Sequence, residues 1–336
     1  MEYISRRGKS LNPLSILTHD HPDPDALASA WSLSRLAEGL CGVRARIVYG
    51  GVIARTENRM MMERLRLPAQ PVRGGEPPRF DHVALVDTQP AFKNNRFPAG
   101  KNPDIVIDHH PRDGGTRARF AWIDRRVGAT TTLMAQALVA SGLSVSRRLA
   151  TAIIYGIGSE TQNLGREATA VDLEAYQTFW PKASIKTLWN ISYPKRSRFF
   201  FADLTRALTG AFICRNVIGS HLGDLRSPER VAQIADFLLT HEKAGWSIVT
   251  GRYKGKLYVS LRTTDSRGGA GTLLKRLLGG KNRGGGHSQI AGGALDVGLG
   301  ASPEKWIEAE RGLADSFLES RGIKHPEQKS YPYRHV

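Results

Sequence analysis

The chain has 336 residues, of which 40% are hydrophobic and 24% charged, and its formal net charge is +17. This composition is typical of a soluble globular protein with room for two domains, and no run reaches the roughly 18–20 apolar residues of a membrane helix. The N-terminal residues lack the apolar stretch of a secretory signal. Cys41 and Cys214 lie far apart in apolar surroundings, which favours reduced thiols and a cytoplasmic protein.

Short apolar runs alternate with amphipathic stretches over the first 160 residues. This pattern predicts strands at 14–18, 46–49, 82–86, 104–107 and 120–123, and helices at 26–39, 130–142 and about 146–157. Asp25 can cap the first of these helices. The alternation predicts an α/β domain with a doubly wound, mainly parallel sheet. We assign this domain to residues 1–192, including helices after residue 170 that pack on it.

A linker is expected at residues 193–208, because Pro194 interrupts the helical pattern and basic residues follow it. Residues 209–325 predict a second, smaller α/β domain that binds the substrate. Its expected elements are a helix at about 229–241, strands at 246–253 and 256–262, a helix at 272–278, a glycine-rich turn at 284–286 and a strand near 294–297. The tail after about Gly322 is polar, which predicts loose order.

Basic residues are concentrated in the second domain. From Arg252 to Arg283 there are nine lysines and arginines against one acid, Asp265. Such a cluster favours polyanionic ligands such as nucleotides and nucleic acid.

Carboxylates and imidazoles recur near the ends of three predicted strands. Residues 19–25 read HDHPDPD, residues 86–88 read VDT and residues 107–110 read IDHH. Because the carboxyl ends of strands border the ligand crevice of an open parallel sheet, these side chains should converge. A crowd of carboxylates needs protons or cations to neutralise it, and interleaved histidines indicate metal.

These segments, with GIGSETQNLG at 156–165, resemble in order and spacing the motifs of the DHH phosphoesterase superfamily. RGGGHSQIAGG at 283–293 resembles the glycine-rich loop of the DHH-associated C-terminal domain. The subfamily of that superfamily whose two-domain chains have a similar length includes nanoRNases, pAp phosphatases and phosphodiesterases of cyclic or linear dinucleotides. The resemblance covers nearly the whole chain.

A two-metal site is implied by this resemblance. His19 and Asp23 would hold one metal, Asp25 and His109 would hold the second, and Asp87 would bridge both. Such a bridge keeps two cations about 3.5–4 Å apart, the spacing used in two-metal hydrolysis. A mixed set of imidazoles and carboxylates fits Mn²⁺ best, with Mg²⁺ or Co²⁺ as alternatives.

Catalytic roles are implied for two further residues. His110 would face the scissile phosphate, and Asp108 would hold a metal ligand in place. Where the family usually supplies an aspartate ligand, this chain has Glu160. Glutamate is one methylene longer, so we expect Glu160 to reach a metal, either directly or through water.

Substrate binding is expected in the second domain. Gly284, Gly285 and Gly286 can turn their backbone N–H groups toward an anion. Together with His287 and with Arg262 on a predicted strand, they would hold the far end of the substrate. We therefore expect one substrate to bridge the two domains, with cleavage slowing beyond about five nucleotides because no extended single-strand groove is predicted.

The sequence thus predicts a cytoplasmic, nucleic-acid-binding hydrolase. We expect a metal-dependent phosphodiesterase of the nanoRNase or exonuclease kind. Its expected substrates are short oligonucleotides or linear or cyclic dinucleotides, from which it releases mononucleotides. Alternatives are a pAp phosphatase and a pyrophosphatase or exopolyphosphatase, although the basic Ser-Arg-Lys-Lys-type motif of the superfamily's pyrophosphatases is absent. A non-catalytic nucleotide-binding regulator is favoured only by Glu160. The sequence leaves open the base preference, the choice between RNA and DNA and the direction of attack. It also leaves open the oligomeric state, for which a homodimer is one alternative.

Overall fold

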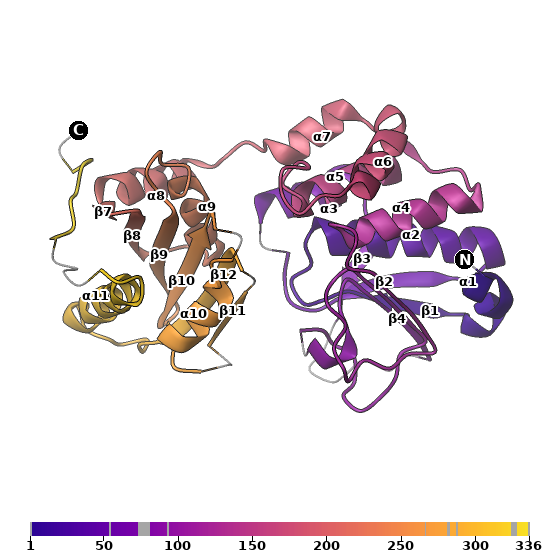
Figure 1. Ribbon diagram of the computed structural model, residues 1–336, viewed down its shortest axis with the longest axis horizontal. Coiled ribbons are helices and arrows are strands. Elements are labelled where there is room, and N and C mark those ends of the chain that lie inside the picture. The colour runs from indigo at the N-terminus through magenta and orange to yellow at the C-terminus, as the bar shows by residue number, and fades with distance from the viewer. Residues whose placement is uncertain are drawn as a thin grey trace. The chain divides into compact units, whose positions relative to one another are not determined.

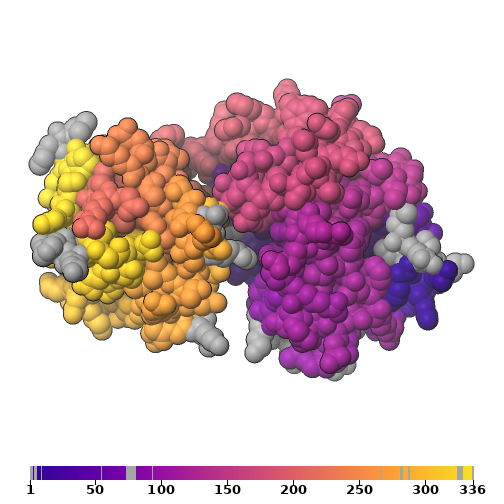
Figure 2. All heavy atoms as spheres, in the orientation of Figure 1, coloured from indigo at the N-terminus to yellow at the C-terminus, as the bar shows by residue number. Residues whose placement is uncertain are grey.

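The computed structural model describes residues 2–53, 55–72, 81–92, 94–265, 267–280, 283–286, 288–323 and 328–334. The chain divides into two compact units, Met1–Pro194 and Lys195–Val336. The first unit is coloured indigo to pink and the second continues to yellow in the ribbon of Figure 1 and in the atoms of Figure 2. Among the described residues, no helix is both long and apolar enough to span a membrane.

A six-stranded sheet, in which every neighbouring pair is parallel, forms the base of the first unit. Across the sheet the strands are β3 (Ala69–Pro71), β2 (Ala45–Tyr49), β1 (Leu14–Leu17), β4 (His82–Val86), β5 (Ile105–Asp108) and β6 (Phe120–Ile123). The strand order reverses between the neighbours β1 and β4, which makes their carboxyl ends the place where ligands bind in doubly wound sheets. The predicted doubly wound α/β fold is therefore confirmed.

The helices of the first unit lie mainly on one side of this sheet (Figure 1). They are α1 (Glu2–Arg7), α2 (Pro24–Cys41), α3 (Thr56–Leu65), α4 (Thr130–Ser141), α5 (Arg147–Glu160), α6 (Ala170–Phe179) and α7 (Ile185–Ser192), with 3-10 turns η1 (Gly8–Leu11), η2 (Pro90–Phe92) and η3 (Trp180–Lys182). Neither α3 nor β3 was predicted; β3 has only three residues and ends in proline, which weakens the strand pattern.

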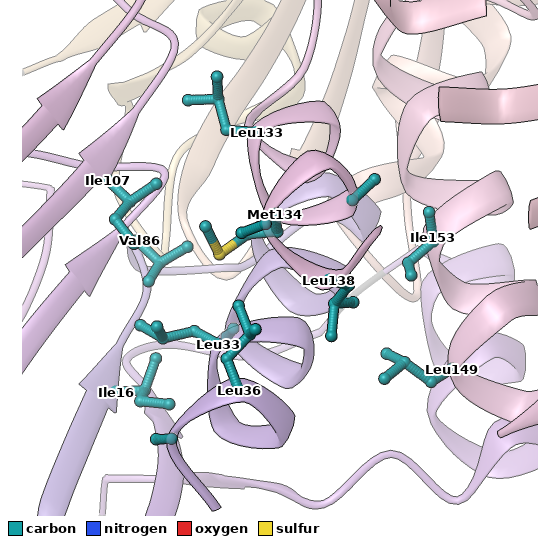
Figure 3. Packing of buried hydrophobic residues seen from close by; sticks show 14 of the residues in the cluster. Ile16, Leu33, Leu36, Val86, Ile107, Leu133, Met134, Leu138, Leu149 and Ile153 are labelled. Atoms are coloured by element: carbon teal, nitrogen blue, oxygen red, sulfur yellow. The ribbon is translucent and has the colours of Figure 1, made fainter. Parts of the chain in front are cut away.

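The main core of the first unit joins the sheet to α2, α4 and α5. Figure 3 shows strand side chains facing helical ones: Ile16, Val86 and Ile107 from the sheet, and Leu33, Leu36, Leu133, Met134, Leu138, Leu149 and Ile153 from the helices. Burying each large aliphatic side chain contributes about 1.5–3 kcal/mol. This packing holds the three helices, and hence the residues at their ends, in fixed positions over the strands.

Helix α2 begins earlier than predicted because its cap is Asp23, not Asp25. The Asp23 side chain accepts a hydrogen bond from the backbone N–H of Ala26 at 3.0 Å, and Pro24 occupies the first helical position, where its missing N–H costs nothing. Asp25 is consequently a buried residue of the first helical turn. Both carboxylates are thus fixed at the start of α2.

Helix α5 continues to Glu160, past its predicted end near 157. A Cβ atom on Gly156 would lie 2.7 Å from Oγ1 of Thr131 and 3.0 Å from Cβ of Ala28. Because glycine has no side chain, α5 can approach α2 and α4 closely at this point. The approach carries the C-terminal end of α5, with Glu160, toward the start of both helices.

The second unit contains another six-stranded sheet, in which β8 and β9 pair in parallel and the other described pairs are antiparallel. In spatial order its strands are β11 (Gly284–Gly286), β12 (Ile290–Asp296), β10 (Lys256–Thr263), β9 (Trp246–Tyr253), β8 (Val217–Asp224) and β7 (Phe212–Cys214). Helices α8 (Arg198–Thr209) and α9 (Glu229–Leu238) contribute to one hydrophobic cluster, and α10 (Ala270–Leu277) and α11 (Pro303–Ser320) to another.

Three segments of this unit differ from the sequence predictions. The expected linker over 193–208 is largely the helix α8, which Ser197 caps and which buries Ala207 among residues of β8 and α9. The expected turn at 284–286 is a strand paired with β12, and β12 itself begins at Ile290 rather than near 294. Strands β7 and β8 and helix α11 were not predicted.

Candidate metal centre

The predicted acids and imidazoles of the first unit follow the ends of three neighbouring strands. His19 lies two residues beyond β1, Asp87 directly follows β4, and Asp108 is the last residue of β5. His109 and His110 come next in the chain. Since β1, β4 and β5 are adjacent and parallel, their carboxyl ends bring these side chains to one edge of the sheet.

Asp87 lies between two groups of side chains that could each hold a cation. One group is His19, Asp23 and Asp87, and the other is Asp87, His109 and His110. Oδ2 of Asp87 lies 3.6 Å from Nε2 of His19, whereas Oδ1 lies 3.7 Å from Nε2 of His109. The two oxygens of one carboxylate thus face different groups, which is the arrangement of a bridging ligand.

The backbone at Asp87 supports this orientation. Its φ angle is 58°, a left-handed conformation that aspartate tolerates better than most residues. The turn comes directly after β4 and leaves the side chain buried, with 3% of its surface exposed. A β-branched residue would be strained at this position.

The residues present fit divalent cations. Nε2 of His109 is buried and has no hydrogen-bond partner among the described residues, although buried nitrogens are normally paired. Burial raises the pKa of Asp87 well above its usual range, and the nearby carboxylates of Asp25 and Asp23 raise it further. Cations between these groups would pair the nitrogen and neutralise the carboxylates.

Charge is distributed unevenly within the first group. Burial disfavours the charged form of His19, but the hydrogen bond and charge of Asp23 outweigh it and raise the pKa of His19 to about 9. Burial likewise opposes ionisation of Asp23, but the contact with His19 prevails and lowers the pKa of Asp23. A cation at this position would have to displace the proton of His19, because only the neutral imidazole is a ligand.

Asp25 is held by the start of helix α4. Its Oδ2 accepts a hydrogen bond from the backbone N–H of Thr130 at 2.8 Å, and its Oδ1 accepts one from Thr131 at 2.7 Å. The same Oδ2 lies 3.9 Å from Nε2 of His109. Oδ1 also accepts from Oγ of Ser29 at 3.4 Å, whereas Oδ2 keeps a second lone pair, so these bonds leave Asp25 able to act as the predicted ligand.

Glu160 belongs to neither group of mutually close ligand atoms among the described residues. Burial and the charges of Asp23 and Asp25 raise the pKa of Glu160 to about 8. The carboxyl group therefore interacts electrostatically with the acids of the site, although its oxygens lie outside the two groups. Its role as a ligand stays a prediction.

His110 and Asp108 form a hydrogen-bonded pair that Gln89 supports. Nδ1 of His110 lies 2.8 Å from Oδ1 of Asp108, and the buried Gln89 donates from Nε2 to Oδ2 of Asp108 at 2.7 Å. Oε1 of Gln89 accepts bonds from Asp113 and Thr116. Burial opposes the charged form of His110, but the contact with Asp108 outweighs it and raises the pKa of His110.

Sequence reasoning missed Gln89 and the threonines at the start of α4. Gln89 follows the VDT motif directly, and Thr130 begins a run of three threonines. A polar run at a helix start is an ordinary capping signal, so only the fold reveals that these side chains contact the site.

The predicted substrate residues lie in the second unit. Arg262 is 4% exposed; its Nε donates to Oδ1 of Asp236 at 2.5 Å, and another guanidinium nitrogen donates to Oγ of Ser260 at 2.6 Å. Gly284–Gly286 form the edge strand β11. A Cβ atom on Gly271 would lie 2.3 Å from the carbonyl oxygen of Gly286, so α10 and β11 touch backbone to backbone. His287 lies outside the described residues.

The chain is similar to known proteins over most of its length. Residues 13–157 match the DHH family, N-terminal domain. A protein of Methanocaldococcus jannaschii, itself uncharacterised, is 33% identical over 324 residues, which cover 94% of this chain and 66% of that protein. The chain therefore spans slightly less than two thirds of the length of this curated relative.

Comparison with solved structures finds one that shares the fold. An exopolyphosphatase-related protein from Bacteroides fragilis aligns with a TM-score of 0.72 at 14% identity, covering 95% of this chain and 97% of its own. A pGpG-specific phosphodiesterase from Vibrio cholerae covers 93% of this chain and 99% of its own at 13% identity, with a TM-score of 0.39. The first likeness establishes a common fold, and the second is too distant to support an argument.

Proposed function

We propose that this chain, whose residues 13–157 match the DHH family, N-terminal domain, is a cation-dependent phosphodiesterase. Its proposed substrates are short oligonucleotides or linear or cyclic dinucleotides, which it hydrolyses to mononucleotides. We assign hydrolysis to the first unit and substrate binding to the second. The thiols of Cys41 and Cys214 support a reducing compartment such as the cytoplasm.

The observation that carries this proposal is the position of Asp87 between two groups of ligand atoms. Its Oδ2 faces His19 and its Oδ1 faces His109; Asp25, 3.9 Å from His109, would complete the second site, because His110 is kept for the proton. One carboxylate shared by two such groups suits a pair of cations, and carboxylates mixed with imidazoles suit Mn²⁺, with Mg²⁺ and Co²⁺ as alternatives. When bound, the cations would activate a water molecule and offset charge on the phosphoryl oxygens.

His110 is the proposed proton donor. The hydrogen bond to Asp108 fixes its Nδ1 as the protonated nitrogen, so a proton exchanged with the substrate leaves or joins at Nε2. The raised pKa of His110, caused by Asp108 against the effect of burial, favours the charged ring that can donate to the phosphate or to the leaving oxygen. Asp108, in turn held by Gln89, keeps the ring from rotating.

A substrate panel with Mn²⁺ tests the proposal. The panel contains pGpG, pApA, cyclic di-AMP, RNA of increasing length, pAp and pyrophosphate, and the products are identified after digestion. We expect mononucleotides from the dinucleotides, falling rates beyond about five nucleotides and loss of turnover with EDTA. Preference for pAp or pyrophosphate would assign a phosphatase or pyrophosphatase instead, and binding without turnover would assign a regulator.

Asp87→Asn tests the role of the shared carboxylate. The substitution keeps the shape of the side chain and removes the charge that both groups share. We expect it to fold and to lose nearly all turnover. Asp124→Asn is its control: Asp124 follows β6 in the same sheet but pairs with the exposed Arg126. Equal activity of the two variants would contradict the two-cation assignment.

A further inference from the structure

Thr130, the first residue of α4, contacts three residues of the metal centre. Its backbone N–H donates to Oδ2 of Asp25 at 2.8 Å. Its hydroxyl donates to Oδ1 of Asp87 at 2.8 Å and accepts from the backbone N–H of His109 at 3.2 Å. Thr130 is fully buried, so water does not compete for these bonds.

The direction of the hydroxyl bonds follows from the atoms involved. A backbone N–H can only donate, so the oxygen of Thr130 accepts from His109. Its single proton then points to the one remaining partner, Asp87. A hydrogen bond to a carboxylate favours the ionised form and fixes the plane of the group. The hydroxyl therefore sets which oxygen of Asp87 faces His109 and which faces His19.

Thr130 is itself held in place by hydrogen bonds that its neighbours in the chain make at the start of α4. The N-cap residue Ala129 has no side chain that could cap the helix, and the first N–H groups donate to Asp25 instead. Asp172 of α6 accepts bonds from the backbone N–H of Gly128 and from the hydroxyl of Thr132. The residues on both sides of Thr130 are thus tied down, which leaves its hydroxyl little freedom to move.

We propose that Thr130 is a positioning residue, whose hydroxyl orients the carboxylate of Asp87 for cation binding. This inference rests on the proposed function, because it concerns the same site. Partners that orient metal ligands typically change metal affinity or activity by about 10–100-fold when they are removed. We expect an effect of this size from the hydroxyl alone.

Two substitutions isolate the hydroxyl. Thr130→Val keeps the branched shape and the N–H bond to Asp25 but removes the hydroxyl. Thr130→Ser keeps the hydroxyl and removes only the methyl group. Titration with Mn²⁺ alone, followed by calorimetry or by the spin resonance of the ion, should show affinity weakened about 10–100-fold in Thr130→Val and restored in Thr130→Ser. Thr130→Ala serves as the second hydroxyl-free variant if Thr130→Val does not fold.

Thr151→Val is the matched control. Thr151 is also fully buried in the first unit, and its hydroxyl also donates one bond, to Arg147 O at 2.7 Å, and accepts one from a backbone N–H, that of Ser184 at 2.8 Å. We expect Thr151→Val to lower Tm as much as Thr130→Val while leaving the affinity for Mn²⁺ unchanged.

The results that overturn the inference are distinct. Wild-type affinity in Thr130→Val, loss of affinity in Thr130→Ser, or equal loss in Thr151→Val would each show that the hydroxyl of Thr130 does not orient the site. Failure of the wild-type chain itself to bind Mn²⁺ would instead overturn the proposed function, and the inference with it.

Discussion

Asp108 holds the imidazole of His110 at two points, because Nδ1 and the backbone N–H of His110 contact the same Oδ1 at 2.8 and 3.1 Å. The ring and its own backbone are therefore fixed by one oxygen. The other oxygen is held by Gln89, so the carboxylate cannot rotate away. This relationship makes the protonation state and the direction of His110 depend on Asp108.

Asp108→Asn should lower kcat about 10²–10⁴-fold, the range for a positioned general acid or base, with a smaller effect on KM. The amide keeps the size of the side chain but lacks the charge that raises the pKa of His110. The rates of Asp108→Asn, His110→Ala and the double variant give a double-mutant cycle. Because the two residues act as a unit, the double variant should be no slower than the slower single variant; additive losses would contradict the pair.

Glu160 is tested by three variants. If it ligates a cation, Glu160→Gln should weaken Mn²⁺ binding and strongly reduce turnover, and Glu160→Asp should retain or gain activity. The exposed Glu167 provides the control Glu167→Gln, which should behave as wild type. Indistinguishable behaviour of wild type, Glu160→Gln and Glu160→Asp would place Glu160 outside the ligand set.

Affinity for Mn²⁺ should rise with pH. Cation binding requires deprotonated ligands, whereas the pKa of Glu160 is raised to about 8 by burial and by Asp23 and Asp25, and that of His19 to about 9 by Asp23 against burial. Calorimetry in buffers of different ionisation enthalpy should therefore detect proton release on binding near neutral pH. An affinity that does not change as pH rises through 8 and 9 would contradict these shifts.

The stability of the metal-free protein should fall as pH rises, whereas its affinity for Mn²⁺ should rise. Both groups have a higher pKa in the folded state than their ordinary values of 4.5 for Glu160 and 6.5 for His19, so the folded state binds more protons. Unfolding free energy then falls as pH rises through these folded-state values. The Tm measured with EDTA should decline over this range, and the Tm of Glu160→Gln should decline less than that of wild type. A Tm that rises with pH would contradict the prediction.

His287→Ala should raise KM for dinucleotides and leave Mn²⁺ affinity unchanged, since the proposed cation ligands all lie in the first unit. His241→Ala, in the same unit as His287, is the control. Arg262→Ala should also raise KM, but its bonds to Asp236 and Ser260 predict a lower Tm as well. If Asp236→Asn reproduces the whole effect of Arg262→Ala, Arg262 supports the sheet rather than the substrate.

Local signals predicted most strands of the first sheet well, whereas the role of the acids and histidines as ligands stays a prediction. Apolar runs bounded by polar turns identified β1, β4 and β6 closely, and the acids and histidines stand directly after such runs. The contact between Thr130 and Asp87 could not be predicted, because it joins residues 43 positions apart through the packing of α4 on the sheet. Arg198–Thr209 resembled a linker because Phe199 to Phe201 and the arginines hide the amphipathic pattern that buries Ala207.

Asp25 has a consequence for how an inactive form of this protein should be made. Its carboxylate completes the hydrogen bonding of the first turn of α4, a helix that starts 105 residues later. A substitution at Asp25 therefore uncaps a core helix while it removes a proposed ligand, and low activity in such a variant would not distinguish misfolding from lost chemistry. An inactive but folded protein, for trapping substrate or for crystallisation with a dinucleotide, is better obtained at His109, whose Nε2 has no hydrogen-bond partner among the described residues.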